Sequence, residues 1–93
     1  MENQVNDTLR IECQNALTTL EKLNISNTDE LKSKLNWCLG SYDYDKNPSG
    51  LYEMGIVALE TLKDFKKQNP RKVNKKIIEG LAGSIQAFEA GRN

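Results

Sequence analysis

The chain has 93 residues, of which 38% are hydrophobic and 28% are charged, with 13 basic side chains against 13 acidic ones. This length suits one domain with a modest core, and the balanced charge provides no general attraction for nucleic acid or membrane. The sequence contains no histidine, which excludes His-dependent catalytic triads and nearly every catalytic zinc site. We therefore expect a non-catalytic protein with no metal and no cofactor.

The first predicted helix covers about residues 4–23, and the second covers about 28–42. In both, apolar residues recur every three or four positions, as one face of a helix requires. These residues are Val5, Leu9, Cys13, Ala16, Leu17, Leu20 and Leu23, then Leu31, Leu35, Cys38, Leu39 and Tyr42. Asn27 with Glu30 suits a capping box at the start of the second helix, and Thr28 is the competing cap.

The third and fourth predicted helices cover about residues 48–67 and 70–90. Each follows an Asn-Pro pair, Asn47-Pro48 and Asn69-Pro70, in which asparagine caps the helix and proline takes its first position. Their apolar faces comprise Leu51, Met54, Gly55, Ala58, Leu59, Leu62 and Phe65, then Val73, Ile77, Leu81, Ile85 or Ser84, and Phe88. No segment alternates like a strand, and the joints are short. The sequence predicts an all-α fold, an antiparallel up-down four-helix bundle in a single domain.

Small residues recur at helical spacing in the last two helices. They are Gly55 and Ala58 in the third, with Gly80, Gly83, Ser84 and Ala87 in the fourth. Glycine inside a helix costs about 1 kcal/mol relative to alanine. Either the backbones of these two helices approach closely, or the fourth helix frays at this point.

One stretch is faintly similar to a tetratricopeptide repeat. It carries Leu39-Gly40, Gly50, Tyr52, Ala58-Leu59, Phe65 and Pro70. The turn between its two helices is too long for that family, and the unit does not recur along the chain, although such repeats need about three copies for stability. The resemblance implies at most a helical interaction module and assigns no residue a role.

The longest predicted loop, Asp43–Gly50, presents the oxygen-bearing side chains of an EF-hand in order. Read from Asp45, oxygens fall at loop positions one, three, five and nine, and a glycine falls at six. Ile56 occupies the position that requires a bidentate glutamate, and Pro48 stiffens the loop. Calcium binding is therefore a minor alternative, and turns and helix caps are the simpler interpretation.

A basic run between residues 63 and 76 divides into two parts. Lys63, Lys66 and Lys67 meet the negative end of the third helix dipole and need no further function. Arg71, Lys72, Lys75 and Lys76 fall in the first turns of the predicted fourth helix, where free N–H groups and positive charge together could attract an anion. A solvated polar face is the simpler alternative.

Four aromatic residues lie near the predicted long loop: Trp37, Tyr42, Tyr44 and Tyr52. They could form an interface, or they could cap one end of a small core. The two cysteines fall on apolar faces, and the first residues lack a signal-peptide pattern, so we expect buried, reduced thiols in a cytoplasmic protein.

These features favour a protein-protein interaction domain whose partner is another protein or a second copy of itself, forming a homodimer. The alternative is an anion or nucleic-acid backbone binder that uses the four cations of the fourth helix, which we do not favour because no exposed aromatic residue lies near them. No apolar run approaches the roughly 20 residues of a membrane span, so a membrane is not an expected partner.

Overall fold

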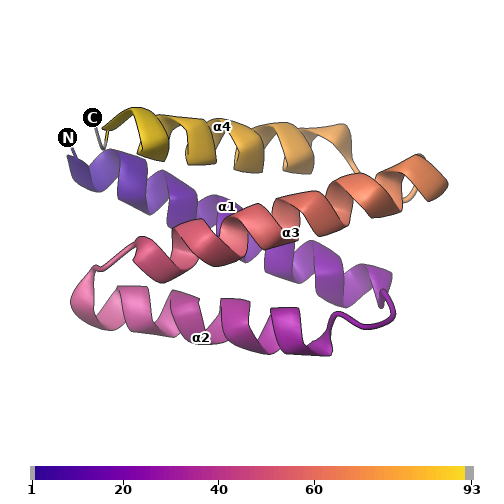
Figure 1. Cartoon of the computed structure of the whole chain (residues 1–93), viewed down its shortest axis with the longest axis horizontal. Helices are drawn as coiled ribbons and strands as arrows, with labels where there is room; N and C mark the ends of the chain where they lie inside the picture. Colours follow the sequence, from indigo (N-terminus) through magenta and orange to yellow (C-terminus); the bar gives the residue numbers. More distant parts are fainter. Residues whose placement is uncertain (1, 92–93) are drawn as a thin grey trace.

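A computed structural model describes residues 2–91, with side chains from residue 4 onward. It contains the helices α1 (Glu2–Leu23), α2 (Asp29–Asp45), α3 (Ser49–Gln68) and α4 (Lys75–Gly91), and none of the described residues forms a strand. The molecule measures 37 × 23 × 16 Å along its principal axes. In Figure 1, α1 and α3 cross at the centre, α2 and α4 lie on opposite sides of the crossed pair, and both termini lie at one end.

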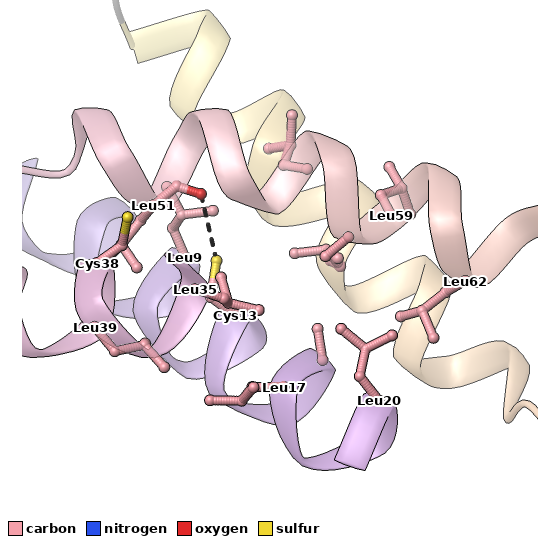
Figure 2. Packing of buried hydrophobic residues seen from close by; sticks show 14 of the residues in the cluster. Leu9, Cys13, Leu17, Leu20, Leu35, Cys38, Leu39, Leu51, Leu59 and Leu62 are labelled. Carbon is pink, nitrogen blue, oxygen red and sulfur yellow. Dashed lines mark hydrogen bonds between the residues drawn. The ribbon is translucent and has the colours of Figure 1, made fainter. Parts of the chain in front are cut away.

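The four helices differ in how many other helices they contact. Helices α1 and α3 each contact all three other helices, whereas within residues 2–91 α2 and α4 do not contact each other. The apolar faces expected from the sequence form one core. It comprises Leu9, Cys13, Ala16, Leu17, Leu20, Leu35, Cys38, Leu39, Tyr42, Leu51, Ala58, Leu59, Leu62, Val73, Leu81 and Ile85. Figure 2 shows this packing around the crossing of α1 and α3.

Glycine permits close contact at the centre of this core. Gly55 is buried, and a Cβ atom built on it would lie 3.4 Å from the Cys13 sulfur, with Leu81 and Ile85 of α4 just beyond. A Cβ on Gly80 would clash with the carboxylate of Glu12 on α1. The fourth helix does not fray at its glycines, and Gly80 serves contact with α1 rather than with α3.

The start of the second helix differs from the sequence-based expectation. Asn27 adopts a left-handed backbone with φ of 64°, so the capping box with Glu30 does not form. Thr28 occupies the cap position, but its hydroxyl donates to the carbonyl of Ile25 at 2.6 Å and does not accept from the helix. Thr28 therefore holds the connection 24–28 closed.

The long loop expected at 43–50 is shorter in the structure, because α2 continues to Asp45. Lys46 ends the helix in the left-handed region, where its N–H donates to the carbonyl of Tyr42 at 2.7 Å. Asp45 then accepts from the N–H of Asn47, and Asn47 accepts from the N–H of Ser49, which begins α3. Two side-chain acceptors thus make this tight turn.

The fourth helix begins at Lys75, later than the Asn69-Pro70 signal suggests. Its cap is Asn74, whose side-chain oxygen accepts from the N–H of Lys76 at 2.9 Å. The connection 69–74 is held by the buried side chain of Val73 and by the ammonium of Lys66, which donates to the carbonyls of Pro70 and Val73 at 3.1 and 2.8 Å. The chain is therefore non-helical at Pro70, and α4 starts five residues later.

Replacing Lys66 with methionine tests this account of the 69–74 connection. The change keeps the alkyl stem but removes both hydrogen bonds, so we expect the free energy of unfolding to fall by about 1 kcal/mol. The measurement is urea unfolding followed by circular dichroism. Lys67→Met, on an exposed neighbour, is the control and should change stability by less than about 0.5 kcal/mol; equal effects would contradict the account.

Candidate functional site

An open groove of about 550 Å³ lies between α3 and the start of α2 together with the connection 25–28. Apolar side chains supply much of its surface, and a polar rim surrounds them. The lining residues are Ile25, Ser26, Asn27, Thr28, Glu30, Leu31, Lys34, Met54, Val57, Thr61, Asp64, Phe65 and Gln68. Because α4 lies on the far side of the crossed pair, the last helix does not cover this groove.

A second hollow of about 290 Å³ adjoins the first toward the start of α3. Its lining includes Trp37, Cys38 and Glu53, and it shares Lys34 and Met54 with the larger hollow. The two neighbouring hollows lie along α2 and α3, and we call them together the α2–α3 groove. Trp37 stands at one end of this groove with 72% of its surface exposed.

The charges on the rim of the groove are unevenly distributed. Lys34 pairs with Glu30 at 3.0 Å on the α2 side, one helical turn apart. On the α3 side, Glu53 and Asp64 are both exposed. The rim is therefore mildly acidic around an apolar floor.

The four aromatic residues expected at an interface divide into two pairs. Trp37 and Tyr44 are exposed, Tyr44 at 92%. Tyr42 is buried at 2% exposure and belongs to the core, because it falls on the inward face of α2; its hydroxyl donates to Asp7 at 2.7 Å. Tyr52 is half-buried, donates to Glu89, and packs its ring 4.9 Å from that of Phe88.

A bidentate ion pair joins α1 to the end of α2. The Arg10 guanidinium donates to both carboxylate oxygens of Asp43, at 2.8 and 2.7 Å. These bonds lower the pKa of Asp43 and raise the pKa of Arg10. Nearby, burial and the bond to Asp7 raise the pKa of Tyr42 to about 12. Each of these polar groups is engaged in holding helices together.

Both cysteines are free and buried, as the sequence indicates. Cys13 donates to the carbonyl of Leu51 at 3.5 Å, drawn as the dashed line in Figure 2. Burial raises the pKa of Cys13 to about 12 and also raises that of Cys38. Because the thiolate is the reactive form of cysteine, the fold suppresses thiol chemistry at neutral pH.

The four cations proposed as an anion site do not share a helix start. Arg71 and Lys72 lie on the turn before α4, and only Lys75 and Lys76 lie in its first turn. Asn74 already accepts the Lys76 N–H, and Lys75 lies 3.8 Å from Glu79. All four side chains are exposed, but only Lys75 and Lys76 lie at the positive end of the α4 dipole, where free N–H groups could help to bind an anion.

The calcium interpretation of the loop also loses its geometric support. Asp45 and Asn47 accept backbone N–H groups in the turn, and Ser49 already belongs to α3. Among the described residues, no group of three or more Cys, Asp or Glu side chains could hold a metal ion. Within the same part of the chain, no helix is both long and apolar enough to cross a membrane.

The sequence pattern did not reveal the α2–α3 groove. Leu31, Met54 and Phe65 read as core positions, yet the structure leaves each of them half-buried along the groove. Two residues could have indicated the groove in the sequence. Val57 and Trp37 are large and apolar but lie beside the inward faces of their helices, and the structure exposes both.

The raised pKa of Tyr42 predicts a loss of stability at alkaline pH. The folded protein favours the neutral phenol, because the pKa of Tyr42 is about 12 in the folded state and near 10 in the unfolded state. The contribution of Tyr42 to the free energy of unfolding is therefore complete below pH 10 and is lost as the pH rises toward 12. Urea unfolding at pH 8, 10 and 11 should show a stability difference between wild type and Tyr42→Phe that shrinks with pH. The control is Tyr44→Phe, on the exposed ring, whose free energy of unfolding should equal that of the wild type at each pH. A stability difference between the wild type and Tyr42→Phe that stays constant with pH would contradict the prediction.

The described part of the chain therefore presents the α2–α3 groove, the exposed side chain of Trp37 and polar groups that connect neighbouring helices. Nothing in this set of side chains resembles a nucleophile with its base, or a phosphate-binding loop. In comparisons with known proteins, no family model, no curated protein and no solved structure matches the chain.

Proposed function

We propose that this protein is a non-catalytic interaction domain that binds another protein through the α2–α3 groove. The observation that carries the proposal is a pair of adjoining hollows with shared lining residues and with Trp37, the single tryptophan of the chain, at one end. A buried apolar centre with a polar rim is the usual anatomy of a protein interface. Tryptophan is also enriched among the residues that dominate binding energy.

The shape of the groove favours an amphipathic helix as the bound element. Such helices place their apolar face into a groove and contact it through residues three and four positions apart. Met54, Val57 and Phe65 provide a floor along α3, and the acidic side chains of Glu53 and Asp64 stand near its two ends. We therefore expect a partner helix with an apolar face and basic flanks.

We further infer that the helices form an antiparallel up-down bundle and that the protein resides in the cytoplasm. Short connections at 24–28, 46–48 and 69–74 support the first inference, because they leave little length for a crossover. Buried free thiols support the second, since cysteines commonly remain reduced in that compartment.

The alternative, an anion or nucleic-acid backbone binder, rests on the exposed side chains of Arg71, Lys72, Lys75 and Lys76. If the groove is the functional surface, the wild type should not be retained on immobilised heparin even at low salt. Retention that falls with rising salt and disappears when all four are replaced with glutamine would instead favour the alternative, because phosphate or sulfate contacts release counterions.

Site-specific photo-cross-linking in living cells tests the groove directly. A photoreactive amino acid at Thr61, inside the groove, should yield a discrete adduct with one protein, whereas the same amino acid at Gln86 on the exposed side of α4 should not. Adding Val57→Glu should abolish the Thr61 adduct, because it places a charge on the apolar floor.

The control for this experiment is Lys67→Glu, an equal charge introduced outside the groove. It should leave the adduct unchanged while circular dichroism shows both variants folded. Adducts of equal yield from Thr61 and Gln86, or an adduct insensitive to Val57→Glu, would contradict the proposal.

A further inference from the structure

The smaller hollow of the α2–α3 groove suits one inserted side chain. Its volume of about 290 Å³ lies below the roughly 300–1,000 Å³ of pockets that hold a whole drug-sized molecule. Cys38 and Gly50 close its floor, since a Cβ atom built on Gly50 would lie 2.9 Å from the Cys38 sulfur. Met54 adds a half-buried apolar side chain to the lining. Protein interfaces place their strongest anchor residues in well-packed pockets of this kind.

An aromatic ring and a carboxylate line this hollow from opposite helices. Trp37 lines it from α2 with 72% of its surface exposed, so the ring is open to a ligand. Glu53 lines it from α3 and is also exposed. Burial and the charge of Glu53 together raise the pKa of Cys38, so the field of this carboxylate reaches the floor of the hollow.

The negative charge of this hollow is not neutralised by the chain itself. Among the side chains of residues 4–91, none forms an ion pair or a hydrogen bond with the Glu53 carboxylate. Lys34 is the one cation among the lining residues, and it pairs with Glu30 on its own helix at 3.0 Å. The hollow therefore offers an exposed ring and an unpaired carboxylate above an apolar floor.

We propose that this hollow receives an arginine side chain of the partner helix. The guanidinium then lies against the Trp37 ring and donates to the Glu53 carboxylate, while its methylene stem covers Met54. The inference rests on the proposed function, and it names the anchor residue of the helix that the groove binds.

Arginine suits these groups better than other side chains do. Its planar guanidinium stacks on an aromatic face and donates two parallel hydrogen bonds to one carboxylate. A lysine ammonium is a compact, strongly hydrated charge that cannot form this pair of bonds. An apolar side chain would fill the hollow but would remove water from an unpaired carboxylate, which is unfavourable.

Titration of the full chain with capped amino acids tests this preference without the partner. The probe is N-acetyl-arginine methylamide, and nuclear magnetic resonance follows the indole N–H of Trp37, the single tryptophan of the chain. The indole signal should shift and reach saturation. N-acetyl-citrulline methylamide, which has a similar shape without the charge, and N-acetyl-lysine methylamide should each bind at least about tenfold more weakly.

A pair of matched variants assigns the response to the hollow. Glu53→Gln should raise the dissociation constant of the arginine probe by at least about tenfold, because it removes the charge that the guanidinium meets. Glu60→Gln is the control, the same change at an exposed position of α3 that lines neither hollow, and it should leave that constant unchanged.

The Thr61 cross-link separates this inference from the proposed function. Glu53→Gln should lose most of the Thr61 adduct, whereas Glu60→Gln should retain it. An adduct that survives Glu53→Gln, or equal binding of the arginine and citrulline probes, would overturn the inference and leave the groove proposal standing. A selective arginine response without any Thr61 adduct would refute the groove proposal, while the preference of the hollow for arginine stands.

Discussion

The crossing of α1 and α3 is the contact on which the rest of the structure depends. At this crossing, Cys13 of α1 packs against the first half of α3. The Cys13 thiol donates to the carbonyl of Leu51, and the missing side chain of Gly55 leaves space beside the sulfur. Because these two helices each contact every other helix, any side chain that separated them would disturb all the remaining interfaces. The thiol here is a packing element, held protonated by burial.

This crossing also determines which surfaces remain available for partners. Helix α2 packs on one side of the crossed pair, so its apolar residues face α1 and α3 while its opposite side faces solvent. Where α2 and α3 diverge, half-buried Leu31, Met54 and Phe65 line the groove. The same helix therefore contributes one edge of the groove and a side that faces solvent.

Apolar periodicity was sufficient to predict four helices and most of the core, since burial on one face is a local property of each helix. The predicted start of the fourth helix at Asn69-Pro70 was wrong, because an Asn-Pro pair is also compatible with a turn. In the structure this segment is a connection, fixed by the hydrogen bond from Lys66 to the carbonyl of Val73 and by the buried Val73 side chain. For Tyr42, the second of the two interpretations, a place in the core, matches its burial, because it falls on the inward face of α2. The groove was beyond sequence reasoning, because it depends on the angle between two helices.

The separation of α2 from α4 has a consequence for partial unfolding. Each flanking helix packs only on the crossed pair, among the residues that the structure describes, so one can detach while the other keeps its contacts. Native proteins open in cooperative units of differing free energy. We therefore expect the two flanks to open as distinct units of that kind, so that strain on α2 leaves the contacts of α4 with α1 and α3 in place.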